Sequence, residues 1–283
     1  TAILEAARLA PSAFNEQPWR YFVGKRGDET FNQILAGLGE FNQTWAKNSS
    51  ALMLVCGTKQ RANGEPHPTN TRHECMEICK RTNNMYPWFG IEQEYVIKNI
   101  KGNGYEWDKL GWRTGAKQGP YYCGIGGDRN FGRNIVMEHM NACIKAGVKI
   151  CGVNAEVAPA QWEFQIGICN PFEMGDHLWM ARYILGRVAE SHDACISYDP
   201  KPFGENWNGS GAHTNFSTKS MRADGGIKYI HQAIEKLATK HQEHMAVYGD
   251  GNDRRLTGIH ETSNMDKFTY GECDRGSSVR IPI

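Results

Sequence analysis

The sequence has no excess of either charge sign and no long apolar segment. Its 32 Lys and Arg residues almost balance its 31 Asp and Glu residues, which gives a net charge of +1. Such a balance shows no sign of the basic surface that nucleic acids require. No apolar run approaches the roughly 20 residues that span a bilayer, and we expect no signal peptide. The sequence therefore predicts neither a nucleic-acid partner nor a membrane partner.

Cysteines in the spacing C-x-x-C are also missing. The chain has nine cysteines, an odd number, and Cys75 and Cys79 would be neighbours on one face of a helix. This spacing suits neither a zinc site nor a disulfide scaffold. Reduced thiols fit the cytoplasm, which is the location that we expect.

The sequence does contain enough apolar residues for a substantial core. Hydrophobic residues make up 40% and charged residues 22% of the 283 positions, enough for one large domain or two ordinary ones. The turn-rich stretch "GTKQRANGEPHPTNT" at 57–71 is the best candidate for a domain boundary. Periodicity predicts helices at 2–10, 72–82, 131–146, 175–191 and 225–248. It predicts strands at 20–24, 51–56, 89–97, 148–157 and 161–168, with long loops over 101–130 and little regular structure after 249.

Carboxylates recur inside the predicted strands. The run "WFGIEQEYVI" at 88–97 contains Glu92 and Glu94, which a strand directs to one face, where they repel each other. Glu156 and Glu163 lie in similarly apolar strands. From the pattern alone, solvent-facing positions would explain these acids equally well. Four such acids with no Lys or Arg close by in the sequence favour a divalent cation, and oxygen ligands suit Mg²⁺ or Mn²⁺.

Two further segments supply polar groups. His213 lies in "WNGSGAHTNFS" at 207–217, a predicted loop of small residues that lets the backbone approach a ligand. A lone His is nevertheless more often a satisfied polar residue than a ligand. Guanidinium groups, which suit carboxylate and phosphate oxygens but are also common on surfaces, occur at Arg254, Arg255, Arg275 and Arg280. Metal-binding carboxylates combined with several arginines favour phosphoryl transfer.

Seven motifs, in one order from about residue 62 to 283, resemble the glutamine synthetase family of the eukaryotic type. They are "PWFGIEQEY", "GPYYCGIGGDRNFGR", "NAEVAPAQWEFQIG", "DPKP", "WNGSGAHTNFSTKSMR", "RRLTGIHETSN" and "RGSSVRIP". The resemblance implies an α+β fold, a curved antiparallel sheet flanked by helices, with carboxylates inside the curve. It also implies an ATP-dependent ligase that joins ammonia to L-glutamate through a γ-glutamyl phosphate, with Mg²⁺ or Mn²⁺ bound. Members of the family form homo-oligomeric rings.

The resemblance implies metal-ligand roles for five residues. Glu94, Glu156 and Glu163 match the ligands of the metal near the substrate carboxylate. Glu92 and His213 match ligands of the metal that bridges the ATP phosphates. The third ligand of that second metal lies in a family stretch like "YFEDRRP", which is not found before the end of this sequence. We therefore expect the first metal to be held well and the second to be held weakly.

The remaining matches concern substrate and nucleotide. Glu261 matches the flap carboxylate that shields the intermediate from water and helps to deprotonate ammonium. The arginine that contacts the substrate α-carboxylate is matched by Arg255. Asn208 and Gly209 match the glutamate-binding loop. Arg275 and Arg280 match the arginines that hold the transferred phosphate and the nucleotide. Further nucleotide-binding positions are matched by Trp88, Asn215 and Ser217.

The first part of the sequence resembles a different family. The stretches "AARLAPSAFNEQPWRYFV" at 6–23 and "NQTWAKNSSALMLV" at 42–55 resemble the start of flavin-dependent nitroreductases. Polar positions near the flavin are matched by Ser12, Asn15 and Gln17. The phosphate-binding opening and the later flavin contacts of that family are not found, so we expect no bound FMN. We assign 1–56 to a nitroreductase-like fragment and 57–283 to a glutamine synthetase catalytic domain that is incomplete at its C-terminus.

Three functional hypotheses follow from these resemblances. The first is a glutamate–ammonia ligase. The second is a chimeric or truncated inactive protein with a partial metal site, in which ring assembly is in doubt because the small N-terminal β domain of the family is not found. The third and least favoured is an FMN-dependent nitroreductase.

Overall fold

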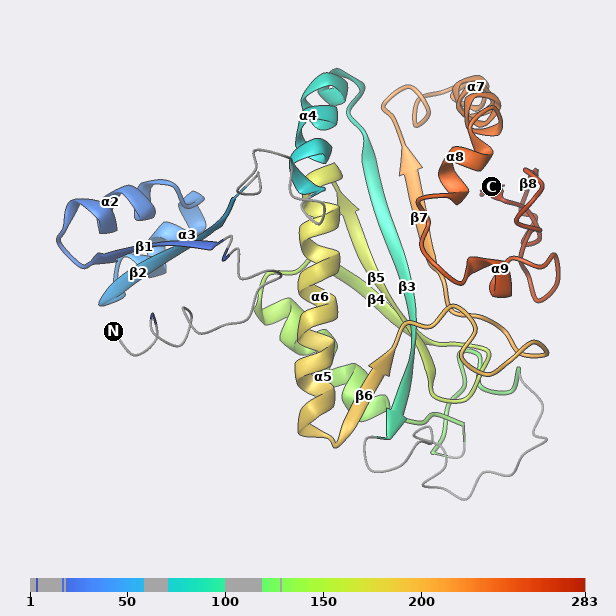
Figure 1. The fold of residues 1–283 in the computed structure, drawn as a ribbon, viewed down its shortest axis with the longest axis horizontal. Helices are drawn as coiled ribbons and strands as arrows, with labels where there is room; N and C mark the ends of the chain where they lie inside the picture. Colours follow the sequence, from blue (N-terminus) through green and yellow to red (C-terminus); the bar gives the residue numbers. More distant parts are fainter. Residues whose placement is uncertain are drawn as a thin grey trace. The chain divides into compact units, whose positions relative to one another are not determined.

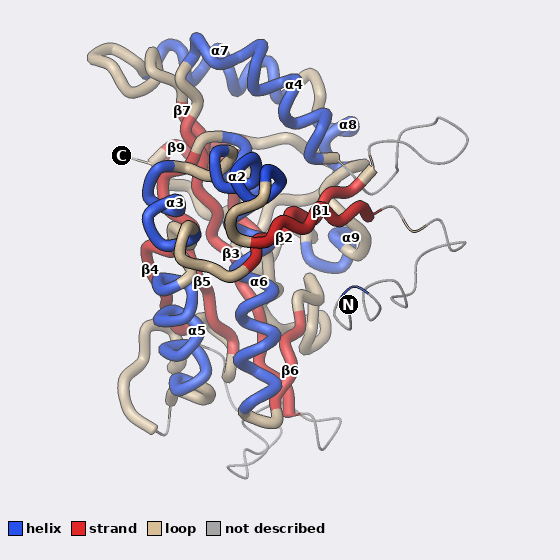
Figure 2. Tube along the Cα trace, turned by 90° about the vertical axis from the view of Figure 1, so that its left-hand side faces the viewer, coloured by secondary structure: helices blue, strands red, loops and turns tan. Residues whose placement is uncertain are grey.

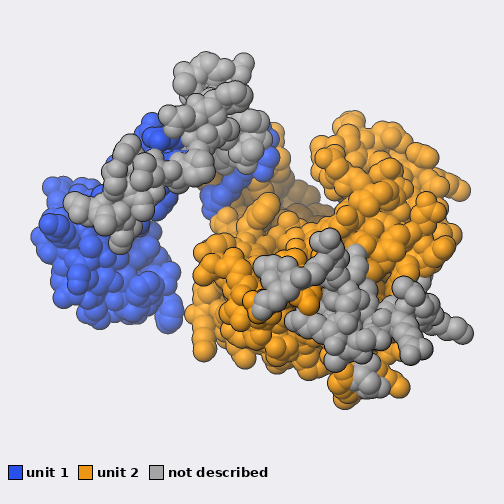
Figure 3. All heavy atoms as spheres, turned by 60° about the horizontal axis from the view of Figure 1, so that its bottom comes forward, with its two compact units in different colours: residues 1–74 blue, residues 75–283 orange. Residues whose placement is uncertain are grey.

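The computed structural model describes Leu4, Gln17 and residues 19–58, 71–99, 119–127 and 129–282. The chain divides into two compact units, residues 1–74 and 75–283 (Figure 3). The predicted helix at 2–10, apart from Leu4, lies outside the described residues, as do Ser12 and Asn15. None of the described helices is both long enough and apolar enough to cross a membrane.

The first unit contains a two-stranded antiparallel sheet. Strand β1 (Trp19–Lys25) pairs with β2 (Ala51–Gly57), and the two include the strands predicted at 20–24 and 51–56. Two helices that the sequence did not predict, α2 (Glu29–Ala36) and α3 (Glu40–Ala46), lie between the strands in the chain. Asp28 begins α2, because its side chain accepts a hydrogen bond of 2.7 Å from the backbone N–H of Phe31.

The second unit is built around an antiparallel sheet with one long central strand, β3 (Trp88–Asn99) (Figure 1). Strand β5 (Gln161–Cys169) pairs along one edge of β3, and β4 (Ile150–Ala155) pairs with β5. The other edge of β3 is shared by β7 (Ala212–Ser217), which pairs with residues 88–93, and β6 (Ala194–Ser197), which pairs with residues 96–99. This arrangement of an antiparallel sheet and helices confirms the predicted α+β class.

Two helices, α5 (Arg133–Lys145) and α6 (Pro171–Ser191), pack on one face of this sheet (Figure 2). The core between the sheet and these helices contains the fully buried side chains of Tyr95, Trp162 and Phe164. Burial of such aromatic rings contributes a large share of the hydrophobic stabilisation. The indole N–H of Trp162 donates a hydrogen bond of 2.7 Å to the Phe131 carbonyl, so this ring is buried without losing a polar partner.

Helix α6 begins four residues before the predicted position. The Asn170 side chain accepts from the backbone N–H groups of Phe172 and Glu173, and the Glu173 side chain accepts from the Asn170 N–H. This reciprocal capping box, followed by Pro171 at the first helical position, fixes the start of the helix. The hydrophobic periodicity used for the prediction begins only in the following turn.

Two sequence predictions are corrected by the structure. The single helix expected at 225–248 is broken into α7 (Ile227–Ala238) and α8 (His241–Met245). Interactions of His241 outside the helix accompany the break: its Nε2 lies 2.7 Å from the Met265 carbonyl and its ring packs edge-on against Phe268. The prediction of a loop at 207–217 is wrong for residues 212–217, because these residues form β7. Pairing with β3, a partner more than 100 positions away in the chain, makes it a strand.

The other described elements are short. Helix α4 (Arg72–Thr82) agrees with its prediction and is followed by a 3₁₀ turn (Asn83–Met85). The C-terminal part contains α9 (Asn252–Arg255) and the parallel pair β8 (Tyr270–Glu272) and β9 (Val279–Ile281). Most of this part is irregular, as predicted.

The buried His139 of α5 gives a prediction about pH. Its Nε2 lies 3.0 Å from the Ala181 carbonyl of α6 and 3.2 Å from Cys143 Sγ, and its side chain is fully buried. Burial lowers the pKa of His139 from 6.5 to about 4. The imidazole of the unfolded chain is protonated below about pH 6.5, whereas that of the folded chain is protonated only below about pH 4. The free energy of unfolding therefore falls as the pH drops from about 6.5 to about 4, by up to roughly 3 kcal/mol.

Urea unfolding of wild type and His139→Gln across this pH range checks the prediction. We expect the wild type to lose more stability than the variant as the pH falls, because Gln does not titrate. Carboxylate protonation affects both proteins equally and therefore cancels in the comparison. Parallel pH profiles for the two proteins would contradict the assignment.

Candidate active site

The face of the second sheet opposite α5 and α6 carries the predicted acidic residues. Along each strand, side chains alternate between the two faces. Because Tyr95 and Trp162 point into the core, their neighbours Glu94 and Glu163 point to the opposite face. Glu94 and Glu163 are also paired directly across β3 and β5. The sheet thus brings together carboxylates that lie about 70 positions apart in the sequence.

The acidic side chains form two groups that fit a metal ion. In each group, one ligand atom per residue lies within 4.8 Å of the others. The first group is Glu94, Glu156 and Glu163, and the second is Glu92, Glu163 and His213. The second group therefore has three donors among the described residues, although the motifs had assigned it only Glu92 and His213. Glu163 belongs to both groups, which was not evident from the sequence because it depends on the pairing of β5 with β3.

Two amides that the sequence analysis missed, Asn154 and Gln165, orient the carboxylates of Glu156, which directly follows β4, and of Glu163 in β5. Asn154 Nδ2 donates to Glu156 Oε1 at 3.0 Å, and the backbone N–H of Val157 donates to Glu156 Oε2 at 3.2 Å. Gln165 Nε2 donates to Glu163 and, at 2.5 Å, to Asn154 Oδ1. Each amide lies two positions from the acid it contacts, the spacing that puts both side chains on one face of a strand. That spacing is the signal that could have found them.

Glu92 is oriented by residues of β7. Its carboxylate lies 3.3 Å from His213 Nδ1 and accepts a hydrogen bond of 2.9 Å from Asn215 Nδ2. These contacts lower the pKa of Glu92, the His213 contact most strongly, and the same contact raises the pKa of His213. Asn215, predicted as a nucleotide-binding position, therefore contacts a candidate metal ligand directly.

The other three carboxylates are held in an unfavourable electrostatic environment. Burial and the neighbouring carboxylates raise the pKa of Glu156 to about 8 and that of Glu163 to about 6. Burial also raises the pKa of Glu94, although the Gly211 N–H donates to it and the charge of Arg255 favours ionisation. Several carboxylates converge here with fewer cations around them, and such convergence is costly unless a cation neutralises it. This donor set, rich in carboxylate oxygen, fits Mg²⁺ or Mn²⁺.

Arg255 lies against the loop that contains Asn208 and Gly209. A Cβ atom placed on Gly209 would lie 2.9 Å from Arg255 Cγ, and one on Gly211 would lie 2.7 Å from Arg255 Cζ. Both positions are therefore limited to glycine if the arginine is to keep its place. The Gln161 side chain fixes the loop by donating to the Gly209 carbonyl at 2.9 Å. The two predicted glutamate-binding features are thus adjacent in the structure.

The predicted flap carboxylate contacts a predicted phosphate-binding arginine. Arg275 Nη1 donates to Glu261 Oε2 at 3.2 Å, and both side chains are about half exposed. Glu261 and the preceding His260 have φ of 60° and 55°, a conformation that non-glycine residues rarely adopt. Thr262 connects the flap to the site, because its hydroxyl donates to the Arg255 carbonyl at 3.1 Å. The charge of Arg280 favours the ionised form of Glu92 and thereby helps to lower its pKa.

Trp88 and Ser217, which are predicted to contact nucleotide, both contact Arg222, a residue that the sequence analysis missed. The guanidinium carbon of Arg222 lies 3.7 Å from the centre of the Trp88 ring. Its Nη1 donates to Ser217 Oγ at 2.8 Å. Arg222 ends the motif "WNGSGAHTNFSTKSMR", and membership of that motif is the signal that could have found it.

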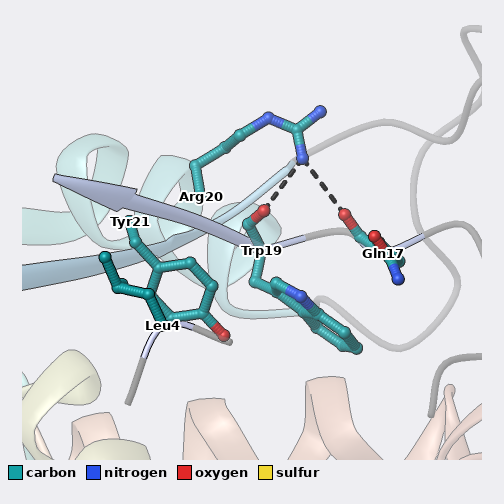
Figure 4. A pocket seen from close by; sticks show the side chains of 5 residues that line it. All are labelled: Leu4, Gln17, Trp19, Arg20 and Tyr21. Carbon is teal, nitrogen blue, oxygen red and sulfur yellow. Dashed lines mark hydrogen bonds between the residues drawn. The ribbon is translucent and has the colours of Figure 1, made fainter. Parts of the chain in front are cut away.

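The first unit contains a separate hollow on its surface (Figure 4). It is lined by Leu4, Gln17, Trp19, Arg20 and Tyr21. Arg20 Nη1 donates to the backbone carbonyls of Gln17, at 3.1 Å, and Trp19, at 2.8 Å. Of the three predicted flavin-side positions, only Gln17 lies among the described residues, and the nitroreductase resemblance stays a prediction.

Comparison with known proteins shows similarity to one family over most of the chain. The family described as glutamine synthetase, catalytic domain, matches residues 70–239. The glutamine synthetases of Tuber borchii and Neurospora crassa are 54% and 53% identical to this chain over 230 residues, which are 81% of this chain and 64% and 63% of those proteins. The glutamine synthetase of Homo sapiens is 54% identical over 246 residues, which are 86% of this chain and 65% of that protein. The chain thus covers less than two thirds of these relatives.

A solved structure titled "Apo GmaS without ligand" is also similar. It has a TM-score of 0.45 and 21% sequence identity, and the match covers 55% of this chain and 35% of that chain.

Proposed function

This chain belongs to the glutamine synthetase family, and from that premise we propose that it catalyses the ATP-dependent ligation of ammonia to L-glutamate. The observation that supports this activity most directly is the convergence of two potential metal-binding groups on one face of the sheet, beside Arg255. A further part of the proposal is that 57–283 derives from a glutamine synthetase and 1–56 from a nitroreductase-like protein.

The two groups of donors would each hold one divalent cation. Glu94, Glu156 and Glu163 would hold the first, and Glu92, Glu163 and His213 the second. Bound Mg²⁺ or Mn²⁺ supplies positive charge that polarises carboxylate and phosphate oxygens. The crowded, partly buried carboxylates are chemically suited to that role because their repulsion is relieved by such an ion.

The cationic side chains bind and orient the substrates. Arg255, next to Asn208 and Gly209, would bind the α-carboxylate of glutamate and leave its γ-carboxylate to attack the γ-phosphorus of ATP. ADP leaves in that step. Arg275 and Arg280 would stabilise the negative charge on the transferring phosphoryl group.

The flap completes the second half of the reaction. Glu261 would accept a proton from ammonium, and the resulting ammonia attacks the acyl carbon of γ-glutamyl phosphate and expels phosphate. Since Arg275 pairs with Glu261 in this structure, a phosphate that engages Arg275 would release the carboxylate for that role. Closure of the flap would also exclude water, which would otherwise hydrolyse the intermediate.

A direct assay tests the proposed function. The purified full chain is supplied with glutamate, ammonia, ATP and Mg²⁺ or Mn²⁺, and formation of glutamine and phosphate is measured, with γ-glutamyl transfer to hydroxylamine as a second assay. We expect metal-dependent activity that EDTA abolishes. A chain that binds Mn²⁺ but makes no product would support the inactive chimeric protein instead. A yellow protein that reduces nitroaromatic compounds would support the nitroreductase.

A further inference from the structure

Gln93 lies between Glu92 and Glu94 but is directed to the helix-covered face of the sheet, where it is 3% exposed. Arg182 of α6 reaches it there. Arg182 Nε donates to Gln93 Oε1 at 3.0 Å, and Nη2 of the same guanidinium donates to the same oxygen. A buried amide between two candidate metal ligands is thus engaged by an arginine from the opposite side of the sheet.

This contact determines which way the amide points. An arginine has only donors, so the oxygen of Gln93 must face Arg182 and its NH₂ group must face away. The NH₂ group donates to the carbonyls of Glu94, at 2.7 Å, and Gly211, at 3.3 Å.

The backbone of Gly211 connects this amide to the candidate metal site. Its carbonyl also accepts from the backbone N–H of Glu94 at 3.0 Å, while its own N–H donates to the Glu94 carboxylate. Gly211 in addition lies against the guanidinium of Arg255. A shift of the Gly211 backbone would therefore move both a candidate metal ligand and the predicted contact to glutamate.

Arg182 is itself held firmly. Its guanidinium carbon lies 5.2 Å from the Trp179 ring centre and 4.9 Å from the Tyr198 ring centre. Across the described part of the chain, no carboxylate forms an ion pair with Arg182. Its charge is therefore directed to the Gln93 oxygen, and hydrogen bonds to a charged donor are stronger than neutral ones.

We propose that Gln93 and Arg182 are positioning residues of the metal site formed by Glu94, Glu156 and Glu163. They hold the Gly211 carbonyl from the helix side of the sheet, and the backbone N–H of the same residue sets the orientation of the Glu94 carboxylate. The inference rests on the proposed function only in that Glu94 binds a divalent cation. Indirect contacts of this kind typically change metal affinity by about 10- to 100-fold.

Mn²⁺ affinity of the purified full chain, measured by electron paramagnetic resonance of free Mn²⁺, tests the proposal. Gln93→Glu keeps an acceptor for Arg182 but loses the NH₂ donors, and Arg182→Met removes the cation. We expect both variants to raise the Kd of one Mn²⁺ site by about tenfold or more. The exposed Arg187 of the same helix pairs with Glu190 on the surface, so Arg187→Met serves as the matched control with unchanged affinity.

Melting temperatures without metal separate positioning from folding. A purely structural role would lower these temperatures and leave the Mn²⁺ affinity of the folded protein unchanged, and that result would overturn the proposal. If Arg182→Met fails to fold, Gln93→Glu decides the question, because it retains the contact with Arg182. A wild type that binds Mn²⁺ but makes no glutamine would contradict only the proposed activity. A wild type without Mn²⁺ binding would overturn the metal site and this inference together.

Discussion

Replacing Glu163 by Gln is expected to weaken both candidate metal sites at once. Glu163 is the one residue common to the two groups of donors, so its loss removes a charged oxygen from each. Contacts that only support a ligand change metal affinity by about 10- to 100-fold, and loss of a ligand itself should reach at least the upper end of that range. Ligation activity should fall by more than the affinity does, because two metals are affected.

The number of Mn²⁺ ions bound and their affinities, measured by electron paramagnetic resonance, check this prediction. Glu156→Gln is the informative comparison, because Glu156 belongs to one group only and should impair one site. Glu190→Gln is the control, since Glu190 is an exposed carboxylate paired with Arg187 on α6. The rise in melting temperature on adding Mn²⁺ should be largest for Glu190→Gln, smaller for Glu156→Gln and smallest for Glu163→Gln. Equal effects of Glu163→Gln and Glu156→Gln would show that Glu163 serves a single metal.

Replacing Gly211 by Ala is expected to impair glutamate binding while leaving the fold intact. The added methyl group would overlap Arg255 Nη2 and lie 2.7 Å from Arg255 Cζ. The end of a flexible side chain can move away at little cost to stability, but the guanidinium would then leave the position predicted for the α-carboxylate. Misplacement of a positioning group by about 1 Å can cost about a hundredfold in rate, and we expect a loss of up to that size.

Two other glycines provide matched comparisons for this variant. A methyl group on Gly209 would overlap the Pro200 carbonyl, which is backbone, so Gly209→Ala should lower the melting temperature as well. A methyl group on Gly175 of α6 meets nothing within 4 Å, so Gly175→Ala should be neutral or slightly stabilising, by up to about 1 kcal/mol. The KM for glutamate and the glutamate-dependent rise in melting temperature are the measurements. An unchanged KM in Gly211→Ala would show that Arg255 does not bind this substrate.

Much of the candidate site could be predicted from local patterns. Two acids spaced two apart in an apolar run must share one face of a strand, so the common direction of Glu92 and Glu94 followed directly from the sequence. Long motifs in a fixed order then indicated which other residues, such as His213 and Arg255, belong to the site. These signals are local or depend on order along the chain, and no knowledge of pairing was needed to find them.

Other features of the site depend on contacts between distant residues. Glu163 serves both groups of donors only because the register of β5 places it opposite Glu94. A shift of one residue in that register would turn it to the core. Arg182 reaches Gln93 across 89 positions, and no local pattern distinguishes it from any other helical arginine.

The sequence by itself thus determined the types of residue in the site and the face of each strand on which they lie, because side-chain direction follows from the backbone period. Tertiary structure alone decided which of them meet. It made residues 212–217 a strand, placed Glu163 in both candidate groups of donors, and brought Arg182 into contact with Gln93. These outcomes depend on strand register and helix packing, which are set by the whole chain and leave no local signal in the sequence.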